Sequence, residues 1–471
     1  MGNFNLNETD LNADKWKYYF YKGKLIISRE ILNKKSLEVE GKNIEADFVE
    51  INEFEAENFA KQSIFSKGNT SGNNKYAYFF KRGDIRNTRR SFIVSTIGEM
   101  LSEIENVNLL NKECIEESSI LPTENKSSKF ILMLIENEKL IAVNINFKTW
   151  EDALFYEKRD RYKINVVGLG DVGGTLLTGL RLLGSDTISS LGIFDKNKEK
   201  SMRWEMELSQ ILSLNQSQLP VEINILKEEE LFDCDVFVFC VSVSVPEVES
   251  KNEKEKTEDV RMVQFESNAK IISEYAKQAR DKNFKGIFAV VSDPVDLLCA
   301  TVYNESNTNS DGEFDAKGLA PEQIRGFGLG VMNARAVYYA SLDEKTKHYL
   351  NEGRAFGPHG EGLIIIDSLN NYNQDISDYL TYKAKTSNLE IRSLGFKPYI
   401  APSLSSGALS ILDMLNENWN YSSSFIDGVF FGSKNKTVDG NIIFERNNLN
   451  EEIMKKIEYT HKYLKSLIRN K

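Results

Sequence analysis

The sequence predicts an α/β protein in which a doubly wound parallel sheet is followed by a smaller α+β region and preceded by a separate, β-rich α+β region. Three observations predict it. Strand and helix patterns alternate from residue 161 onward, a glycine-rich turn joins the first strand and helix there, and residues 1–160 carry apolar strings separated by polar, Asn-rich connections. Alternating strands and helices are typical of parallel sheets covered on both faces. At 471 residues the chain is too long for one ordinary domain, so we expect three, over residues 1–160, 161–329 and 330–471.

The first of these regions contains apolar and aromatic strings of strand length, which start at Trp16 (WKYYFY), Tyr76 (YAYFF) and Ser91 (SFIVST). A fourth string starts at Phe130 (FILMLI) and is followed by a second apolar string after a short polar stretch. We expect these last two strings to form a hairpin with its turn at residues 136–139. No repeat and no catalytic constellation is present in this region, so its role is open.

The alternating region contains six apolar segments of strand length, and these lie near residues 163–167, 190–194, 221–226, 235–242, 285–291 and 324–328. A charged segment over residues 246–260 follows the fourth strand; it lacks apolar periodicity, and we expect a solvated loop there. After about residue 330 the pattern becomes irregular, and it ends in an amphipathic helix from Asn450 to about Ile468.

Composition and charge exclude several classes of protein. The net charge of −11 argues against a nucleic-acid surface, because neutralising phosphates requires clustered Lys and Arg. The basic run from Lys81 to Arg90 is one local exception, and we interpret it as a solvated loop. No apolar run reaches membrane-spanning length, and the first residues show no leader pattern, so we expect a cytoplasmic protein without a membrane partner. The four cysteines are scattered without metal-ligand spacing, so no metal site is expected.

The stretch from Lys163 to Leu177 reads as strand, glycine turn and helix, and it contains G-x-G-x-x-G at Gly168, Gly170 and Gly173. Such a unit binds a dinucleotide: the first glycine permits the tight turn, the second lets the backbone approach the pyrophosphate, and the third lets helix and strand pack closely. Asp195 ends the next strand, where a carboxylate binds the adenosine ribose and repels a 2′-phosphate. The sequence therefore predicts a Rossmann domain that binds NAD rather than NADP.

One of only three histidines, His359, lies in the glycine-flanked turn Gly357-P-H-G-E-G. Its imidazole has an ordinary pKa near neutrality, which suits proton transfer to or from a substrate hydroxyl. Three further segments lie in chain order between the glycine turn and His359: RMVQFESN ending at Asn268, VSDPVD from Val291, and GFGLGVMNAR ending at Arg335.

With these motifs in this order, the chain resembles the lactate and malate dehydrogenase family over about residues 161–471. The resemblance implies NAD as cofactor and hydride transfer to or from a 2-hydroxy/2-oxo acid or a related imino acid. It implies that His359 is the general acid/base, that Arg335 grips the carboxylate of a small-molecule substrate, and that Arg261 polarises the reacting carbonyl. It further implies a homo-oligomer, a dimer or tetramer, and a cis bond before Pro294. The implied cofactor-binding residues are Gly168, Gly170, Asp171, Val172, Gly173, Asp195, Asn268, Ser292 and Asp293, and the implied substrate-binding residues are Arg261, Asp293, Arg335 and His359.

Two departures from the family pattern affect the chemistry. Met332 stands where the family has the carboxylate that orients the catalytic histidine, and a thioether cannot do that. Asp293 replaces the asparagine of the family's N-P-V-D motif. Two hypotheses follow for Asp293: it partly replaces the missing acid beside His359, or it faces a cationic group, such as an iminium, on the substrate.

Two functions remain open on these grounds. The first is an NAD-dependent oxidoreductase, which the joint survival of His359, Arg261 and Arg335 favours. The second is a catalytically impaired NAD-binding or sensing protein that acts through its N-terminal region, which the change to Met332 favours. The substrate itself is not assigned, because the segment before Arg261 is longer than the family's substrate-selecting loop.

Overall fold

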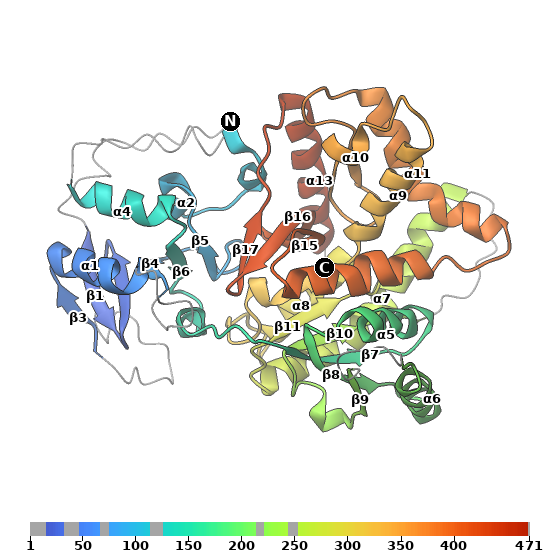
Figure 1. Ribbon diagram of the computed structural model, residues 1–471, viewed down its shortest axis with the longest axis horizontal. Helices are drawn as coiled ribbons and strands as arrows, with labels where there is room; N and C mark the ends of the chain where they lie inside the picture. The colour runs from blue at the N-terminus through green and yellow to red at the C-terminus, as the bar shows by residue number, and fades with distance from the viewer. Residues whose placement is uncertain are drawn as a thin grey trace. The chain divides into compact units, whose positions relative to one another are not determined.

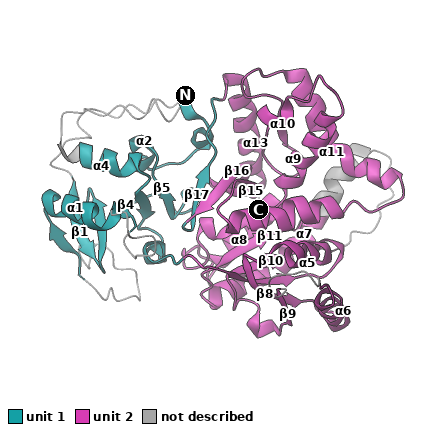
Figure 2. Cartoon of the chain, viewed as in Figure 1, with its two compact units in different colours: residues 1–157, 439–448 teal, residues 158–438, 449–471 magenta. Residues whose placement is uncertain are grey.

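The computed structural model describes residues 16–32, 47–65, 75–113, 126–212, 221–243 and 253–469. The chain forms two compact units (Figure 2): unit 1 comprises residues 1–157 and 439–448, and unit 2 comprises residues 158–438 and 449–471. The predicted 330–471 domain differs from this division, because residues 439–448 belong to unit 1. There β17 (Asn441–Phe444) lies against β5 (Ser91–Ile93), and Arg446 donates to the buried carboxylate of Glu99 at 3.0 Å.

Unit 1 contains a six-stranded mixed sheet in the order β3-β1-β2-β4-β6-β5. β1 and β2 form an antiparallel hairpin, β2, β4 and β6 run parallel, and β5 and β3 pair antiparallel with their neighbours. The strands are β1 (Lys17–Tyr21), β2 (Lys24–Ser28), β3 (Val49–Ile51), β4 (Ala77–Lys81), β5 and β6 (Leu140–Asn144). The helices are α1 (Glu53–Phe59), η4 (Ala60–Ile64), α2 (Ile97–Leu101), η5 (Val107–Leu110), α4 (Lys126–Glu136) and η7 (Trp150–Leu154).

The hairpin predicted around residues 136–139 is wrong in its first half, because the string that starts at Phe130 lies in helix α4. Phe130, Ile131, Leu134 and Ile135 are buried, and this spacing places them on one face of a helix, packed in the core of unit 1. Only the second string is a strand, β6. A short run of strand-forming residues does not by itself distinguish a strand from a buried helix.

The basic run from Lys81 to Arg90 is also less solvated than predicted. Arg89 and Arg90 are buried, and the guanidinium of Arg89 lies 3.0 Å from Glu105 and 3.3 Å from Glu99. Carboxylates supplied by a later segment pair with this arginine, so the chain tolerates its burial.

Unit 2 is built on a sheet whose first six strands run parallel in the order β9-β8-β7-β10-β11-β12 (Figure 1). In chain order this is 3-2-1-4-5-6, which is one form of the doubly wound parallel sheet that the sequence predicts. β15 and β16 extend it antiparallel beyond β12. The strands are β7 (Tyr162–Val167), β8 (Ile188–Phe194), β9 (Glu222–Ile225), β10 (Val236–Phe239), β11 (Ile287–Val290), β12 (Ile324–Gly326), β15 (Asn420–Ile426) and β16 (Val429–Val438). The predicted fold class is confirmed.

Helices follow most of these strands, as the alternation in the sequence predicts, and a small antiparallel pair, β13 (Arg354–Phe356) and β14 (Ile364–Ile366), lies between β12 and β15 in the chain. The longer helices are α5 (Asp171–Leu183), α6 (Lys198–Ser209), α7 (Glu253–Asp281), α8 (Val295–Ser306), α9 (Leu329–Ser341), α11 (Gln374–Ser393) and α13 (Glu451–Arg469). The shorter ones are η8 (Glu228–Glu230), η9 (Pro321–Gln323), α10 (Tyr349–Glu352), η10 (Pro402–Ala408) and α12 (Leu409–Leu415). No helix in the described ranges is long and apolar enough to cross a membrane.

The charged segment 246–260 is not a loop throughout. Helix α7 begins at Glu253, and residues 246–252 lie outside the described residues. The stretch EKEKTEDV contains neither Gly nor Pro and is rich in Glu and Lys, which favour helix even where no apolar face exists.

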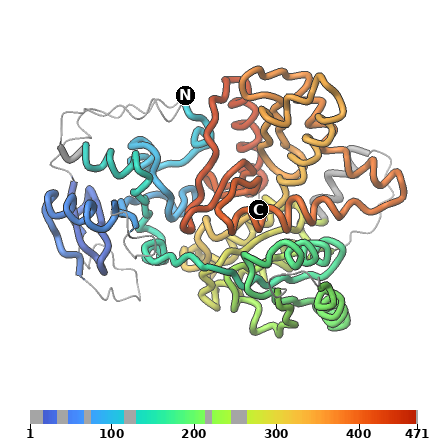
Figure 3. The backbone as a smooth tube through the Cα atoms, in the orientation of Figure 1, coloured from blue at the N-terminus to red at the C-terminus, as the bar shows by residue number. Residues whose placement is uncertain are grey.

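Two distant segments lie side by side in unit 2 and matter for the site. Helix α5 packs against η10 (Figure 3). A Cβ added at Gly179 would lie 2.7 Å from Ala408, and one added at Gly407 would lie 2.7 Å from Leu176. These glycines let the two helices approach closely, so the chain before η10 is held near the start of α5.

Candidate active site

Two of the three glycines in the turn after β7 are required by the packing of the protein itself. Gly168 has φ +90°, and a Cβ there would lie 2.6 Å from the main-chain nitrogen of Val241. A Cβ at Gly173 would lie 2.0 Å from the carbonyl oxygen of Gly168. Gly170 is different, because an added Cβ would meet nothing within 4 Å. The protein itself does not require a glycine there, which fits a position kept open for a ligand.

Helix α5 begins directly after Gly170, and no side chain among the described residues caps its N-terminus. Asp195, after β8, accepts hydrogen bonds from the main-chain N–H groups of Leu169 (2.8 Å) and Asn197 (2.9 Å). The carboxylate is therefore held against the glycine turn. An uncapped helix N-terminus and a carboxylate at the end of the second strand are the two features that a dinucleotide needs.

Asn268 and Ser292 join the ends of the central strands. The side chain of Asn268 is fully buried; it accepts from the N–H of Val243 at 3.0 Å and donates to the carbonyl of Asp293 at 2.8 Å. The hydroxyl of Ser292 donates to the carbonyl of Val241 at 2.6 Å. These bonds hold the segments after β10 and β11 together, and a cofactor contact of either side chain stays a prediction. The peptide bond between Asp293 and Pro294 is cis, as the family resemblance implies.

His359 lies in a tight turn whose glycines at 357, 360 and 362 all have positive φ. Its side chain is 16% exposed, and Nδ1 lies 3.6 Å from Oδ1 of Asp293. This is an ion-pair distance and longer than a hydrogen bond. Gly328 makes room for the ring, because a Cβ there would lie 2.9 Å from Cβ of His359. The structure thus brings together His359 and Asp293, which are distant in the sequence.

Asp296, in the first turn of α8, is a site residue that the sequence reasoning missed. One of its carboxylate oxygens accepts from the main-chain N–H of His359 at 3.3 Å, and the other accepts from the hydroxyl of Ser423. Burial raises the pKa of Asp296 to about 7. The feature of the sequence that could have indicated this residue is its position at the end of the D-P-V-D motif. Its role in supporting the histidine turn depends on a contact across 63 residues of chain.

Asp296 is expected to make stability depend on pH. Because burial raises the pKa of Asp296 from 3.8 to about 7, its contribution to folding is complete below about pH 4 and is lost as the pH rises through 7. Asp296→Asn keeps an acceptor oxygen and cannot ionise. Relative to wild type, the free energy of unfolding of this variant should increase by about 3–4 kcal/mol between pH 4 and pH 8.

Urea unfolding across this pH range checks the prediction, with the exposed Asp311→Asn as the control for general charge effects. A constant difference between Asp296→Asn and wild type would contradict a raised pKa at this position.

Arg335 and Met332 lie one turn apart on α9. Arg335 is buried, and its Nη1 lies 3.5 Å from Sδ of Met332 and 3.3 Å from the carbonyl of Ala384. Burial lowers the pKa of Arg335, and the negative charge of Asp293 partly opposes this. Met332 packs in an apolar cluster. Arg261 lies in α7, but its side chain is outside the described residues.

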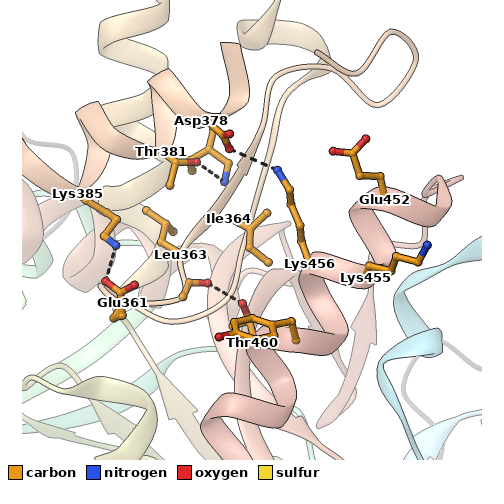
Figure 4. A pocket seen from close by; sticks show the side chains of 13 residues that line it. Glu361, Leu363, Ile364, Asp378, Thr381, Lys385, Glu452, Lys455, Lys456 and Thr460 are labelled. Atoms are coloured by element: carbon orange, nitrogen blue, oxygen red, sulfur yellow. Dashed lines mark hydrogen bonds and ion pairs between the residues drawn. The ribbon is translucent and has the colours of Figure 1, made fainter. Parts of the chain in front are cut away.

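A pocket of about 410 Å³ lies beside the turn that contains His359, on the side of Glu361 and Gly362 (Figure 4). Its walls are α11 and α13 and its floor is β14. Lys385 pairs with Glu361 at 2.6 Å, and Lys456 pairs with Asp378 at 3.4 Å. Three lysines and three carboxylates line it in total. Because the charges balance and several are already paired, this pocket does not have the positive potential that an anionic substrate needs.

The fold and these residues define a class: an α/β protein whose glycine turn has the features of a dinucleotide site and whose histidine lies at the ends of the parallel strands. No group of three His, Cys, Asp or Glu among the described residues is arranged to hold a metal.

Residues 162–314 match the family described as lactate/malate dehydrogenase, NAD binding domain. The resemblance to lactate and malate dehydrogenases is thus confirmed over these residues, and the cofactor of the matched domain is NAD. Unit 1 lies outside the matched residues.

Individual relatives agree with the family match. The chain is 23% identical over 235 residues to an L-lactate dehydrogenase of Thermoanaerobacterium saccharolyticum, covering 49% of this chain and 66% of the relative. It is 25% identical over 289 residues to a probable malate dehydrogenase of Campylobacter jejuni, covering 59% and 87%. An L-lactate dehydrogenase of Lactococcus lactis matches over 57% of its length.

Solved structures show the same fold. A lactate dehydrogenase from a Medee basin deep-sea metagenome library has a TM-score of 0.53 at 19% identity, and the match covers 65% of this chain and 98% of that one. The malate dehydrogenase of Picrophilus torridus has a TM-score of 0.50 at 15% identity, with 66% and 98% covered.

Proposed function

We propose that the chain is an NAD-dependent oxidoreductase that interconverts a small 2-hydroxy acid and its 2-oxo acid, or a related amino and imino acid. The observation that carries this proposal is the position of Asp293, 3.6 Å from Nδ1 of His359. This distance supports a role for Asp293 as the carboxylate partner of His359, in place of the acid that the family has at the position of Met332.

The residues around Gly170 fit NAD: the open space there, the uncapped start of α5 and the carboxylate of Asp195 together form a pyrophosphate and ribose site. NAD(H), when bound, accepts or supplies the hydride. His359 moves the proton of the substrate oxygen or nitrogen. Asp293 orients the imidazole and stabilises its protonated form, because a carboxylate near Nδ1 favours the cation.

Arg335 is the proposed partner of the substrate carboxylate. A planar guanidinium offers two parallel N–H groups to a carboxylate, and its present partners, a thioether and a carbonyl, are weak competitors. Arg261 is the proposed polarising group at the reacting carbonyl. Asp293 supplies the negative charge that Met332 lacks. The proposed site therefore carries as many charged side chains as the family pattern does.

The second candidate function is an NAD-binding or sensing protein of little or no catalytic activity that acts through unit 1. Met332 favours it, because this side chain packs in an apolar cluster and carries no charge to stabilise a protonated imidazole. The two candidates share the cofactor and differ in turnover.

A homo-oligomer in the cytoplasm is part of the proposal. Exposed apolar side chains on α6 (Met202, Met206) and at the end of α5 (Leu182, Leu183) support self-association. The cysteines at 234, 240 and 299 are free thiols, which suits a reducing compartment.

The test combines cofactor binding with a substrate survey. NADH fluorescence should show saturable binding, and assays over 2-oxo acids, with and without ammonia to form imines, should find a substrate whose turnover disappears in His359→Asn. Binding without any turnover that depends on His359 would favour the second candidate. No NADH binding at all would contradict both.

A further inference from the structure

The glycine turn carries an acid that a phosphate site does not need. Asp171 is the first residue of α5, directly after Gly170, and its side chain is 52% exposed. A carboxylate in the first turn stabilises a helix. It also repels the two negative charges of a pyrophosphate bound at the same helix end.

Lys397 neutralises this acid from a distant part of the chain. Its Nζ lies 3.1 Å from Oδ2 of Asp171, and the lysine side chain is 78% exposed. The lysine lies in the segment between α11 and η10, which follows Gly395 at φ +86°. Close packing of η10 on α5 at Gly179 and Gly407 holds this segment beside the start of α5.

Such an exposed ion pair contributes little to stability, so folding alone gives a weak reason for it. The open space next to Gly170 suggests a role for this ion pair in ligand binding. The Cβ direction of Gly170 is open to at least 4 Å, and the flexible lysine stem lets the ammonium reach more than one acceptor beside Asp171.

We infer that Lys397 is a cofactor-binding residue whose ammonium bridges Asp171 and the pyrophosphate of the dinucleotide. In the ligand-free chain Asp171 holds the ammonium at the phosphate site. When the cofactor binds, the same lysine compensates both the carboxylate and the phosphates. This inference rests on the cofactor site of the proposed function, but not on catalysis.

The experiment measures dissociation constants of NADH, ADP-ribose and adenosine by fluorescence or calorimetry for wild type, Lys397→Ala and Asp171→Asn, and for the double variant. Lys397→Ala should weaken NADH and ADP-ribose about tenfold, because a charge-assisted hydrogen bond to phosphate is lost. Binding of adenosine, which has no phosphate, should not change. The salt dependence of NADH binding should also become shallower.

Asp171→Asn should tighten NADH binding severalfold, because repulsion is removed and the lysine is released. The double variant should bind NADH more tightly than Lys397→Ala alone, since the acid is then no longer left uncompensated. Lys347→Ala is the matched control: this lysine forms a similarly exposed pair with Glu344 at 2.7 Å on the α9–α10 connection, and its loss should change none of the constants.

Equal NADH affinity in Lys397→Ala and wild type would overturn the inference. Equal weakening of adenosine and NADH would also overturn it, because the effect would then come from local structure. A change confined to the substrate KM would assign the lysine to the substrate instead and would equally overturn it. If wild type binds NADH but turns over no substrate, only the proposed function fails.

Discussion

Asp293→Asn is expected to lower kcat about 100-fold on the substrate that the survey identifies. The amide keeps the size of the side chain and removes the charge that favours protonated His359. Removing an orienting carboxylate costs up to about 10⁴-fold in a well-formed catalytic pair. We expect less here, because the carboxylate is half exposed and 3.6 Å from Nδ1. Such distances often shorten only in the substrate complex.

The pH profile distinguishes this role from simple damage to the site. Because Asp293 favours protonated His359, its removal should shift the histidine limb of the kcat/KM profile to lower pH. NADH affinity should stay near the wild-type value. In the Asp293→Asn background, Met332→Asp returns an acid to the family position and should recover part of the lost rate, with thermal unfolding as the check on folding.

Higher turnover of ordinary 2-oxo acids in Asp293→Asn would rule out a supporting role for this acid. It would favour the other hypothesis, that Asp293 faces a cationic group on the substrate, and imines would then be the substrates that lose rate in the variant.

Gly173→Ala is expected to disrupt the glycine turn and destabilise the protein. The added Cβ would lie 2.0 Å from the carbonyl oxygen of Gly168 and 3.3 Å from Cβ of Cys240, so backbone must move. We expect a loss of about 3 kcal/mol in the free energy of unfolding and loss of measurable NADH binding, because the turn and the helix start are displaced together.

Gly170→Ala is the matched variant, in which NADH affinity should fall while the free energy of unfolding stays almost unchanged. Gly170 has φ −79°, which alanine adopts readily, and its Cβ would meet nothing within 4 Å. Unfolding should change by less than about 0.5 kcal/mol, while NADH binding weakens about tenfold or more because the methyl group occupies the space beside the pyrophosphate. Denaturant unfolding and NADH titration of both variants check the pair. Equal affinity of Gly170→Ala and wild type would contradict a cofactor at this turn.

The parts of the fold that could be predicted are those that depend on residues close together in the sequence. The presence of six parallel strands follows from alternation and from the glycine turn, because each βαβ unit is specified by neighbouring residues. Their order in the sheet does not follow from these patterns, because doubly wound sheets occur in more than one strand order. The string at Phe130 was mispredicted, because a short apolar run suits a strand and a buried helix equally and only the packing partner decides. The start of α7 within the charged segment was missed because solvated helices carry no apolar stripe.

Local sequence patterns are sufficient to indicate the Rossmann domain, the preference for NAD and the candidate proton carrier, His359, because glycine spacing and turn residues act over a few positions. The contacts between charged groups depend instead on the folded chain: Asp293 lies near His359, Asp296 accepts from the histidine turn, and Lys397 pairs with Asp171. These contacts join strand ends and helix starts that are brought together by sheet order and helix packing. The two hydrogen-bonded pairs lie 63 and 226 residues apart in the chain, so no local pattern contains them.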